Sequence, residues 1–334
     1  MSIETNLSGR LRNTSLPTSH GLMPLFEAVV NSIHSIKELG SDFSSADITV
    51  SIIRSNQTSL SLKDNKSTLE KIVGFKVVDN GSGFNDVNLK SFKTLDSDHK
   101  IDKGCRGVGR LLWLKAFDNI KIRSIYETDD GLNGREFSFD VLEGVKHLSE
   151  FQDNLIKRET VVELKDFQEK YRLAVPKTLE AISKALLEHC LWYFVRDGGC
   201  PSINVLDATD SVSLDDLYEQ YMHEAAYRED LSVCEHTFSI THIKFRASSS
   251  NTHALSFCAA NRLVKEESLS NKIPGMNSKL YDDRGEFIYS CYVSSPYLDD
   301  KVRSERTGFD IEENVDGLFE GKEISLKMIR EAME

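Results

Sequence analysis

The sequence predicts an α+β fold in which helices stack on a mixed, mostly antiparallel sheet. Apolar side chains recur at helical spacing in residues 22–39, and strand-like alternation follows in several short segments. Turn residues, such as the run Asn80-Gly81-Ser82-Gly83, separate these segments. The chain has 334 residues, 40% of them hydrophobic, which suits two domains with ordinary cores. We therefore expect a first α+β layer followed by a second α/β domain.

The elements of the first domain follow from the pattern along the chain. Residues 1–20 are polar and show little periodicity, so we expect an N-terminal arm. A helix is predicted over residues 22–39, with an apolar side made by Leu25, Phe26, Val29, Val30, Ile33 and Ile36. Strands are predicted at 47–54, 58–63, 72–79, 119–126, 134–141 and 160–165. Residues 85–103 are polar and expected to be flexible, and a helix is expected from about Val108.

A second domain is expected to begin near Pro176, because proline is favoured in the first turn of a helix. Its predicted elements are a helix at 177–196, strands at 236–246, 254–260 and 286–294, a hairpin turn at Asn261-Arg262 and a helix from about Val315. The predicted limits are an arm at 1–20, a first domain at 21–172, a second domain at 173–313 and a C-terminal helix at 314–334. We expect the chain to be the front part of a longer protein.

Composition narrows the classes of function. A formal net charge of -12 argues against non-specific DNA binding, so a DNA contact would need a local groove or a segment beyond Glu334. The six cysteines are scattered without CxxC or Cys/His metal spacing, which fits reduced thiols in a cytoplasmic protein. No apolar run is long enough to span a bilayer, and the N-terminus lacks the apolar core of a signal peptide. We therefore expect a soluble, intracellular protein with no membrane partner.

A glycine-rich stretch, KGCRGVGRLLWLKAF from Lys103 to Phe117, stands directly before a predicted helix. Its three glycines let backbone N–H groups approach an anion, and the dipole of the helix adds positive charge at the same place. Bases outnumber acids around it, with Lys100, Lys103, Arg106, Arg110, Lys115, Lys121 and Arg123 against Asp102 and Asp118. The pattern favours a phosphate-binding loop, and a surface turn with a solvated basic face is the alternative.

Glu27 and Asn31 share one face of the helix predicted at 22–39, because they stand four residues apart. The side-chain carbonyl oxygen of Asn31 suits a hard cation such as Mg²⁺, which prefers oxygen ligands. The carboxylate of Glu27 suits the orientation and deprotonation of a water molecule that attacks phosphorus. An ordinary polar helix edge is the alternative for both residues.

Asp79 ends the apolar strand predicted at 72–79. Its carboxylate can accept a hydrogen bond from an exocyclic amino group such as that of adenine. Gly81 and Gly83 would leave room for a flat ring beside the backbone. The alternative is an Asx turn that closes the strand, which is common in Asp-Asn-Gly sequences.

Taken in order, three motifs resemble the Bergerat-type ATP site of the GHKL superfamily: ExxxN (Glu27, Asn31), DxGxG (Asp79, Gly81, Gly83) and GxxGxG (Gly104, Gly107, Gly109). That superfamily includes gyrase-type topoisomerase subunits, MutL mismatch-repair proteins, heat-shock chaperones and MORC ATPases. Thr160 in ETVVEL is similar to the threonine of the superfamily's GT-x-V strand, with Glu159 in place of the glycine. His34 stands where many members have an aspartate.

The resemblance extends into the second domain. FCAANRLV, from Phe257 to Val264, resembles the F-x-N-x-R-x-V hairpin of the MutL-type transducer domain. VRSERTGFDI, from Val302 to Ile311, resembles the later loop from which a basic residue reaches the γ-phosphate. The first candidate for that residue is Arg306 and the second is Lys301, and a surface ion pair is the alternative for Arg306.

What the resemblance implies is a Bergerat-type two-layer α/β sandwich with a transducer-like domain, acting as a slow Mg²⁺-dependent ATPase. In that arrangement Asn31 binds Mg²⁺, Asp79 binds adenine and Glu27 activates water. A basic residue, Arg306 or Lys301, offsets negative charge at the γ-phosphate. Further nucleotide contacts would come from Gly81, Gly83, Lys100, Lys103, Gly104, Arg106, Gly107, Val108, Gly109, Arg110 and Thr160. A lid at about 85–107 would close over ATP and offer Thr94 and Ser97 as phosphate contacts.

The resemblance also implies partners. ATP would promote a homodimer through the arm and the lid, so that hydrolysis to ADP and phosphate times an open–closed clamp. Such a clamp would serve a DNA-linked or defence process and act on an effector or partner protein. The alternative is an ATP-binding interaction module with negligible turnover, which differs in not releasing phosphate over multiple turnovers. A histidine-type protein kinase is less favoured, because that class lacks the second domain and a Glu27-type base.

Overall fold

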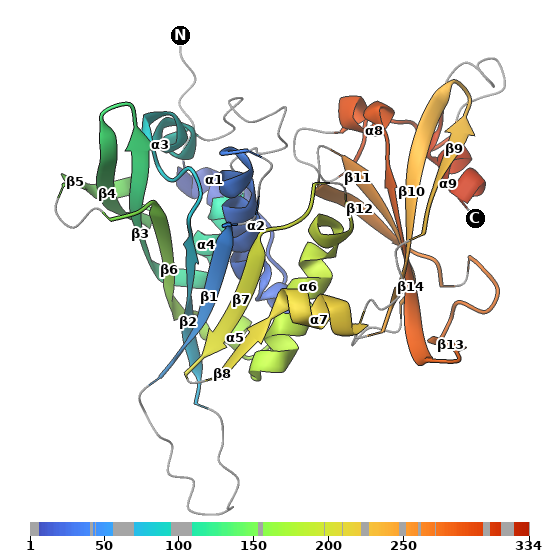
Figure 1. Ribbon diagram of the computed structural model, residues 1–334, viewed down its shortest axis with the longest axis horizontal. Coiled ribbons are helices and arrows are strands. Elements are labelled where there is room, and N and C mark those ends of the chain that lie inside the picture. The colour runs from blue at the N-terminus through green and yellow to red at the C-terminus, as the bar shows by residue number, and fades with distance from the viewer. Residues whose placement is uncertain are drawn as a thin grey trace, which may run out of the picture. The chain divides into compact units, whose positions relative to one another are not determined.

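The structure, a computed structural model, describes residues 7–40, 43, 45–55, 70–94, 109–152, 156–196, 198–208, 210–221, 227–246, 252–259, 262–270, 272–302, 308–314 and 324–333. The chain divides into two compact units, each built on its own sheet (Figure 1). The first unit consists of the described parts of residues 1–99, 107–190 and 197–217. The second consists of the described parts of residues 191–196 and 218–334.

An eight-stranded mixed sheet forms the first unit, with strand order β5-β4-β3-β6-β2-β1-β7-β8. Its strands are β1 (Asp47–Arg54), β2 (Ile72–Asp79), β3 (Phe117–Thr128), β4 (Gly131–Asp140), β5 (Gly144–Phe151), β6 (Glu159–Phe167), β7 (Ser202–Asp207) and β8 (Asp210–Ser213). Neighbouring strands are antiparallel except β1 and β7, which are parallel. The predicted α+β fold with a mixed, mostly antiparallel sheet is therefore confirmed.

Two helices of the first unit, α2 and α4, contact each other and the strands β1, β2 and β3. The helices of this unit are α1 (Leu7–Asn13), the 3-10 helix η1 (Thr18–His20), α2 (Met23–Lys37), α3 (Asp86–Lys93), α4 (Gly109–Ala116) and α5 (Glu169–Arg172). Helical spacing places Leu25, Val29 and Ile33 on one side of α2, and all three are fully buried. The indole N–H of Trp113 in α4 donates to the carbonyl of Pro24 at 3.0 Å. These contacts fix α2 and α4 against each other.

The second unit contains a smaller sheet with strand order β12-β11-β14-β10-β9, and β13 pairs with β14. Its elements are β9 (Tyr227–Val233), β10 (His236–Phe245), β11 (Ala254–Ala259), β12 (Arg262–Ser268), β13 (Leu280–Asp282), β14 (Gly285–Ser294), α8 (Pro296–Lys301) and α9 (Leu326–Met333). Two further helices, α6 (Leu179–Val195) and α7 (Leu214–Tyr221), have residues in both units. The core of the second unit joins the sheet to α8 and α9 through Phe238, Phe257, Val293, Leu298 and Ile329.

Several sequence predictions differ from the structure. The arm at 1–20 contains a helix, α1, and its Ser8 hydroxyl donates to the carbonyl of Val141 at 3.4 Å. The hairpin predicted at Asn261-Arg262 is present between β11 and β12, but Arg262 already belongs to β12, where it pairs with Ala259. The strand predicted at 58–63 lies outside the described residues, as does the first part of the helix predicted from Val315. Strands β5, β7, β8, β9, β12 and β13 were not predicted.

The limit predicted between residues 172 and 173 differs from the division that the contacts show. Strand β7 pairs in parallel with β1, from Asp47 and Ser202 to Ser51 and Leu206. Residues 202–213 therefore complete the sheet of the first unit. The physical reason is long-range pairing, which no local pattern in the sequence reveals. Among the helices of the described residues, none combines the length and apolar character needed to cross a membrane.

Helix α9 is attached to β12 by a cluster of charges around Glu267. The carboxylate of Glu267 forms ion pairs with Lys265 at 2.8 Å, Lys272 at 2.9 Å and the Arg330 guanidinium of α9 at 2.7 Å. Burial alone would raise the pKa of Glu267, but the three cations outweigh burial and lower its pKa to about 2. A depressed carboxyl pKa means that this carboxylate stabilises the fold only while it is ionised.

We expect Glu267→Gln to lower the free energy of unfolding at neutral pH, because the three cations lose their shared partner. The stabilisation by Glu267 is present above the ordinary glutamate pKa of 4.5 and is lost as pH falls toward about 2. The difference between variant and native chain should therefore shrink in that window, as measured by urea unfolding. The matched control is Glu331→Gln, because Glu331 is 61% exposed and pairs with Lys327 only at 3.7 Å. An equal loss of unfolding free energy in both variants would contradict the stabilising role of Glu267.

Candidate functional site

Asp79 lies at the end of β2, between Ile48 of β1 and Thr160 of β6 in the sheet register. Its side chain is 5% exposed and accepts hydrogen bonds from the Ser32 hydroxyl at 2.7 Å and the Gly81 N–H at 2.9 Å. Burial raises the pKa of Asp79 to about 6, although both hydrogen bonds oppose this shift. The Gly81 contact is an Asx turn, so the alternative considered from the sequence is present. The structure thus places a buried carboxyl group that titrates near pH 6 at this sheet end.

The turn after Asp79 is packed against α2 on one side and β3 on the other. A Cβ at Gly81 would lie 2.5 Å from the Ser35 hydroxyl and 2.8 Å from the backbone nitrogen of Ile36. Gly83 has a φ of +68°, and a Cβ there would lie 2.7 Å from the Ser124 hydroxyl. Both positions therefore require glycine for close packing within the protein. Room for a nucleotide ring at these glycines stays a prediction.

Thr160 and Ser124 form a buried hydroxyl pair next to the turn. Thr160 faces Asp79 across the β2–β6 ladder and Ser124 across the β3–β6 ladder. The two hydroxyl oxygens are 2.9 Å apart, and the Phe84 N–H donates to Ser124 at 2.9 Å. Sequence reasoning found Thr160 but missed Ser124 and Ser32. Ser124 is a lone serine within a strand, and no sequence pattern marks such a residue as part of a site. Ser32 directly follows Asn31, and this position next to a predicted metal ligand is the one sequence feature that points to it.

The side chain of Glu27, a residue of α2, lies against the first turn of α4. A Cβ added to Gly109 would lie 2.1 Å from Glu27 Oε2, so only glycine leaves space for the carboxylate there. The N-terminus of a helix favours a negative charge, because its free N–H groups point outward. Asn31 stands one turn further along α2, and both side chains are half-buried. The structure thus brings the ExxxN motif and the last glycine of the GxxGxG motif together.

The remaining residues predicted for the nucleotide site either make other contacts in the structure or lie outside the described residues. Arg110 is buried at 6% exposed; its guanidinium donates to the Thr94 carbonyl at 2.8 Å and lies 5.0 Å over the ring of Phe92. Lys301 is exposed and ends α8 in the second unit, and His34 is buried in α2. The predicted positions outside the described residues are Ser97, Lys100, Lys103, Gly104, Arg106, Gly107, Val108 and Arg306. The roles of all these residues stay predictions.

The start of the predicted lid forms a helix. Residues 86–93 form α3, whose N-terminus is capped because the Asn85 side chain accepts from the Asn88 N–H at 2.9 Å. Phe92 of α3 packs against Phe84, Phe137 and Phe139, with ring centroids 5.0 to 5.6 Å apart. Leu89 and Phe92 give this polar segment an apolar side, which is why it forms a packed helix, and the closing movement of the lid stays a prediction. The remainder of the predicted lid, residues 95–107, lies outside the described residues.

The residues present fit a nucleotide with Mg²⁺ in two respects. Asp79 supplies a buried acceptor, and Asn31 supplies an amide oxygen of the kind that Mg²⁺ binds together with phosphate oxygens. No cluster of three or more His, Cys, Asp and Glu side chains suited to a metal occurs among the described residues.

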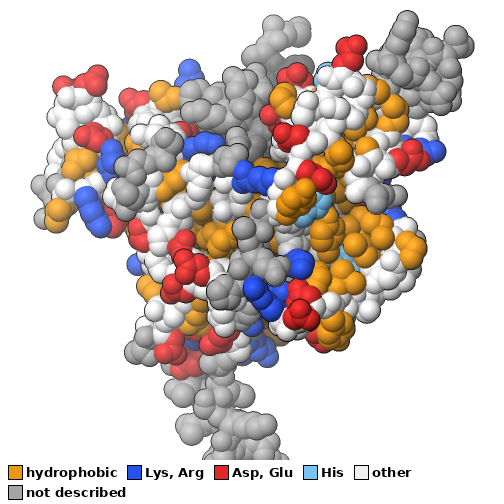
Figure 2. All heavy atoms as spheres, turned by 45° about the vertical axis from the view of Figure 1, so that its right-hand side comes forward, with side chains coloured by type: hydrophobic (Ala, Val, Ile, Leu, Met, Phe, Trp, Pro, Cys, Tyr) orange, Lys and Arg blue, Asp and Glu red, His pale blue; other side chains and the backbone are white. Residues whose placement is uncertain are grey.

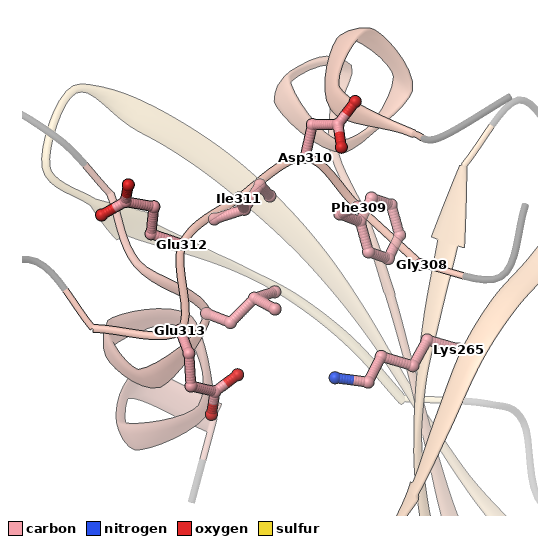
Figure 3. A pocket seen from close by; sticks show the side chains of 8 residues that line it. Lys265, Gly308, Phe309, Asp310, Ile311, Glu312 and Glu313 are labelled. Atoms are coloured by element: carbon pink, nitrogen blue, oxygen red, sulfur yellow. The ribbon is translucent and has the colours of Figure 1, made fainter.

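A separate pocket, of about 550 Å³, lies in the second unit. Its lining is Lys265, Gly308, Phe309, Asp310, Ile311, Glu312, Glu313 and Leu326 (Figure 3). Figure 3 shows the Lys265 side chain directed toward Glu313. Three carboxylates against one ammonium make this lining a poor site for phosphate. Lys301, the predicted γ-phosphate contact that the structure describes, is not part of the lining.

Comparison with solved structures shows a remote likeness in fold, whereas comparison with families and curated proteins finds none. No protein-family model and no curated relative matches the chain. Among solved structures, the chain is similar to the Aquifex aeolicus MutL ATPase domain complexed with ADP, with 12% sequence identity and a TM-score of 0.43. The match covers 86% of this chain and 95% of that one. Because the identity and the score are this low, we derive the function from the residues of the chain itself.

Proposed function

We propose that the first unit binds ATP and that the chain hydrolyses it to ADP and phosphate. The observation that carries this proposal is the convergence of distant motifs on one helix, α2. Ser32 of α2 holds Asp79, and Glu27 of the same helix lies against Gly109. Thr160 joins the same group through its register with Asp79. Segments that are up to 133 residues apart in the sequence, from Glu27 to Thr160, thus belong either to α2 or to the strand end that α2 holds.

The two ends of α2 would serve two ends of the nucleotide. At Asp79, a buried carboxylate would accept a hydrogen bond from the exocyclic amino group of adenine. The fixed position of this carboxylate would favour adenine over other bases. At Glu27, the carboxylate would orient a water molecule and take up its proton during attack on the γ-phosphate. Asn31 would hold Mg²⁺, which when bound offsets the charge of the phosphates. The N-terminus of α4 adds N–H donors at the phosphate end.

The finer features belong to the same proposal. Residues of the glycine-rich loop would contact the phosphates, and Arg306 or Lys301 would approach the γ-phosphate. ATP would promote a homodimer, and hydrolysis would time an open–closed clamp that acts on an effector in a DNA-linked or defence process. Direct DNA binding is not favoured: on the face that Figure 2 shows, acidic and basic side chains are interspersed over the described residues.

The decisive experiment titrates the chain with ATP and Mg²⁺, and separately with a non-hydrolysable ATP analogue. Mass in solution and phosphate release are measured together. The proposal predicts binding of both nucleotides, dimerisation with the analogue, and its reversal as phosphate appears from ATP. Binding with no phosphate over multiple turnovers would instead identify an ATP-gated interaction module. Absence of binding would overturn the proposal.

The pH dependence of nucleotide affinity tests the role of Asp79. Protonation removes acceptor capacity from its carboxylate, so affinity should fall as pH decreases below about 6. The expected limit is about a tenfold rise in Kd per pH unit, measured by calorimetry with the non-hydrolysable analogue. Asp79→Asn is the control, because it shows the titration of the phosphates alone. Identical profiles for the native chain and the variant would exclude Asp79 from the binding contact.

A further inference from the structure

The turn after Asp79 is held by a bracket formed by two residues, Glu38 and Asn88. The Ser82 hydroxyl donates to Glu38 Oε2 at 2.6 Å. The amide nitrogen of Asn88 donates to the Gly83 carbonyl at 2.7 Å, to the Ser82 hydroxyl at 3.1 Å and to Glu38 Oε2 at 3.3 Å. Glu38 is the residue that follows α2, and Asn88 lies in the first turn of α3. The bracket therefore ties the turn to two helices at once.

Other contacts hold the two ends of the turn, and Ser35 of α2 also supports its middle: the Ser35 carbonyl accepts from the Ser82 N–H at 3.1 Å, and the Ser35 hydroxyl accepts from the Gly83 N–H at 3.3 Å. Before it, Gly81 is fixed by the side chain of Asp79. After it, the Phe84 carbonyl accepts from Arg135 at 2.9 Å. The bracket acts between these ends, at Ser82 and Gly83. Gly83 has a positive φ, and its carbonyl accepts from the Asn88 amide.

We propose that Glu38 and Asn88 are positioning residues that set the base selectivity of the nucleotide site. This inference rests on the proposed function. Along α2, Glu27, Asn31, Ser35 and Glu38 are spaced by four, four and three residues, so they share one face. One helix face therefore carries the proposed catalytic base and metal ligand at one end and the supports of the turn at the other. The bracket links the base-binding end to the same rigid element.

Selectivity for an exocyclic amino group depends on an acceptor that is held still. A site built for one hydrogen bond rejects a base that cannot make it, because the buried acceptor is then left unpaired. If the turn relaxes, water can reach Asp79. A base without the amino group then leaves the Asp79 acceptor hydrogen-bonded to water, so the free-energy penalty for binding that base is smaller. Loosening the bracket should therefore weaken binding of ATP more than binding of GTP. It should not alter the chemistry at Glu27.

Asn88→Asp is the sharpest variant, because it keeps the side-chain shape while removing both amide N–H donors. It also places a carboxylate beside that of Glu38, which repels it. An aspartate three residues after the N-cap is favoured by the helix dipole, so α3 itself should not be weakened. We expect the Kd of ATP to rise about tenfold and the ATP-to-GTP preference to fall by a similar factor. The kcat at saturating ATP should stay within about twofold.

Glu38→Gln provides a second variant and a rescue. Alone, it replaces a charged acceptor with a neutral amide oxygen, which weakens the hydrogen bonds from Ser82 and Asn88, so it should lower the ATP-to-GTP preference to a smaller extent. Combined with Asn88→Asp, the amide introduced at position 38 can donate to the carboxylate introduced at position 88, so part of the preference should return. Such recovery is not expected if the single variants merely destabilise the unit. If one variant fails to fold, the other still tests the bracket.

Asp207→Asn serves as the control for general destabilisation. It removes an acceptor of the Arg54 guanidinium, whose Nε lies 2.8 and 3.0 Å from the two carboxylate oxygens, within the same sheet. We expect lower thermal stability but an unchanged ATP-to-GTP preference. If the native chain binds ATP and both bracket variants keep the native preference, this inference alone is wrong. If the native chain binds no ATP, the proposed function fails and the inference with it.

Discussion

Replacing Glu27 with alanine is expected to stop multiple turnover while nucleotide binding persists. Glu27 lies against the first turn of α4, apart from the Ser32–Asp79 contact that would serve the base. Loss of a positioned general base costs about 10²- to 10⁴-fold in rate. Binding should change little, because a carboxylate near phosphate oxygens contributes repulsion rather than attraction to the ground state. Steady-state phosphate release and the Kd of a non-hydrolysable analogue measure the two effects separately.

A matched control for this variant is Glu169→Ala. The side chain of Glu169 is 71% exposed and pairs only locally, with Arg172 at 3.2 Å, so turnover should remain at the native level. If Glu27→Ala loses binding together with turnover, the carboxylate holds the site together rather than activating water. If Glu27→Ala retains native turnover, Glu27 takes no part in the hydrolysis step.

Gly109→Ala is expected to reduce turnover to a similar extent without unfolding the first unit. The new methyl group would lie 2.1 Å from Glu27 Oε2, so the carboxylate must move. The nearest atoms belong to the end of a flexible side chain, which can move aside without disturbing the backbone, so the first unit should stay folded. Displacing a catalytic group by about 1 Å can cost about 10²-fold in rate. Thermal unfolding and phosphate release test the two halves of this expectation.

The double variant Glu27→Ala/Gly109→Ala shows whether both changes act through one carboxylate. If Gly109 matters because it makes room for Glu27, the double variant should be no slower than Glu27→Ala alone. If the two losses in rate multiply, Gly109 contributes independently, for example through its own N–H. That outcome would contradict the steric explanation.

The sequence predicts those parts of the fold that local patterns determine. The apolar spacing of α2 and the alternation in β2 and β6 give their limits to within a few residues. Residue chemistry and motif order also place Glu27, Asp79 and Thr160 in one domain, and the structure brings each of them into the same unit. Their assigned roles remain predictions, since neighbourhood alone does not establish chemistry.

What the sequence misses depends on contacts between distant residues. Helix α3 appears polar in isolation, and its order comes from Phe92 packing on Phe137 and Phe139 of β4. Ser124 becomes notable only when β3 and β6 pair and bring it next to Thr160. The bracket of Glu38 and Asn88 joins residues 50 positions apart. Such features require the register of the sheet and the packing of helices, which no single window of sequence contains.

The parallel pairing of β7 with β1 has a practical consequence for fragments of this chain. A fragment ending at residue 172 would lack β7 and leave β1 as an unprotected sheet edge, next to the buried Ile48, Val50 and Ile52. Free edges of this kind recruit strands from other molecules and lead to aggregation. A fragment that retains β8 would end the sheet in a short strand of four residues, Asp210–Ser213, which offers far less to pair with. The smallest well-behaved fragment of the first unit therefore extends past residue 213.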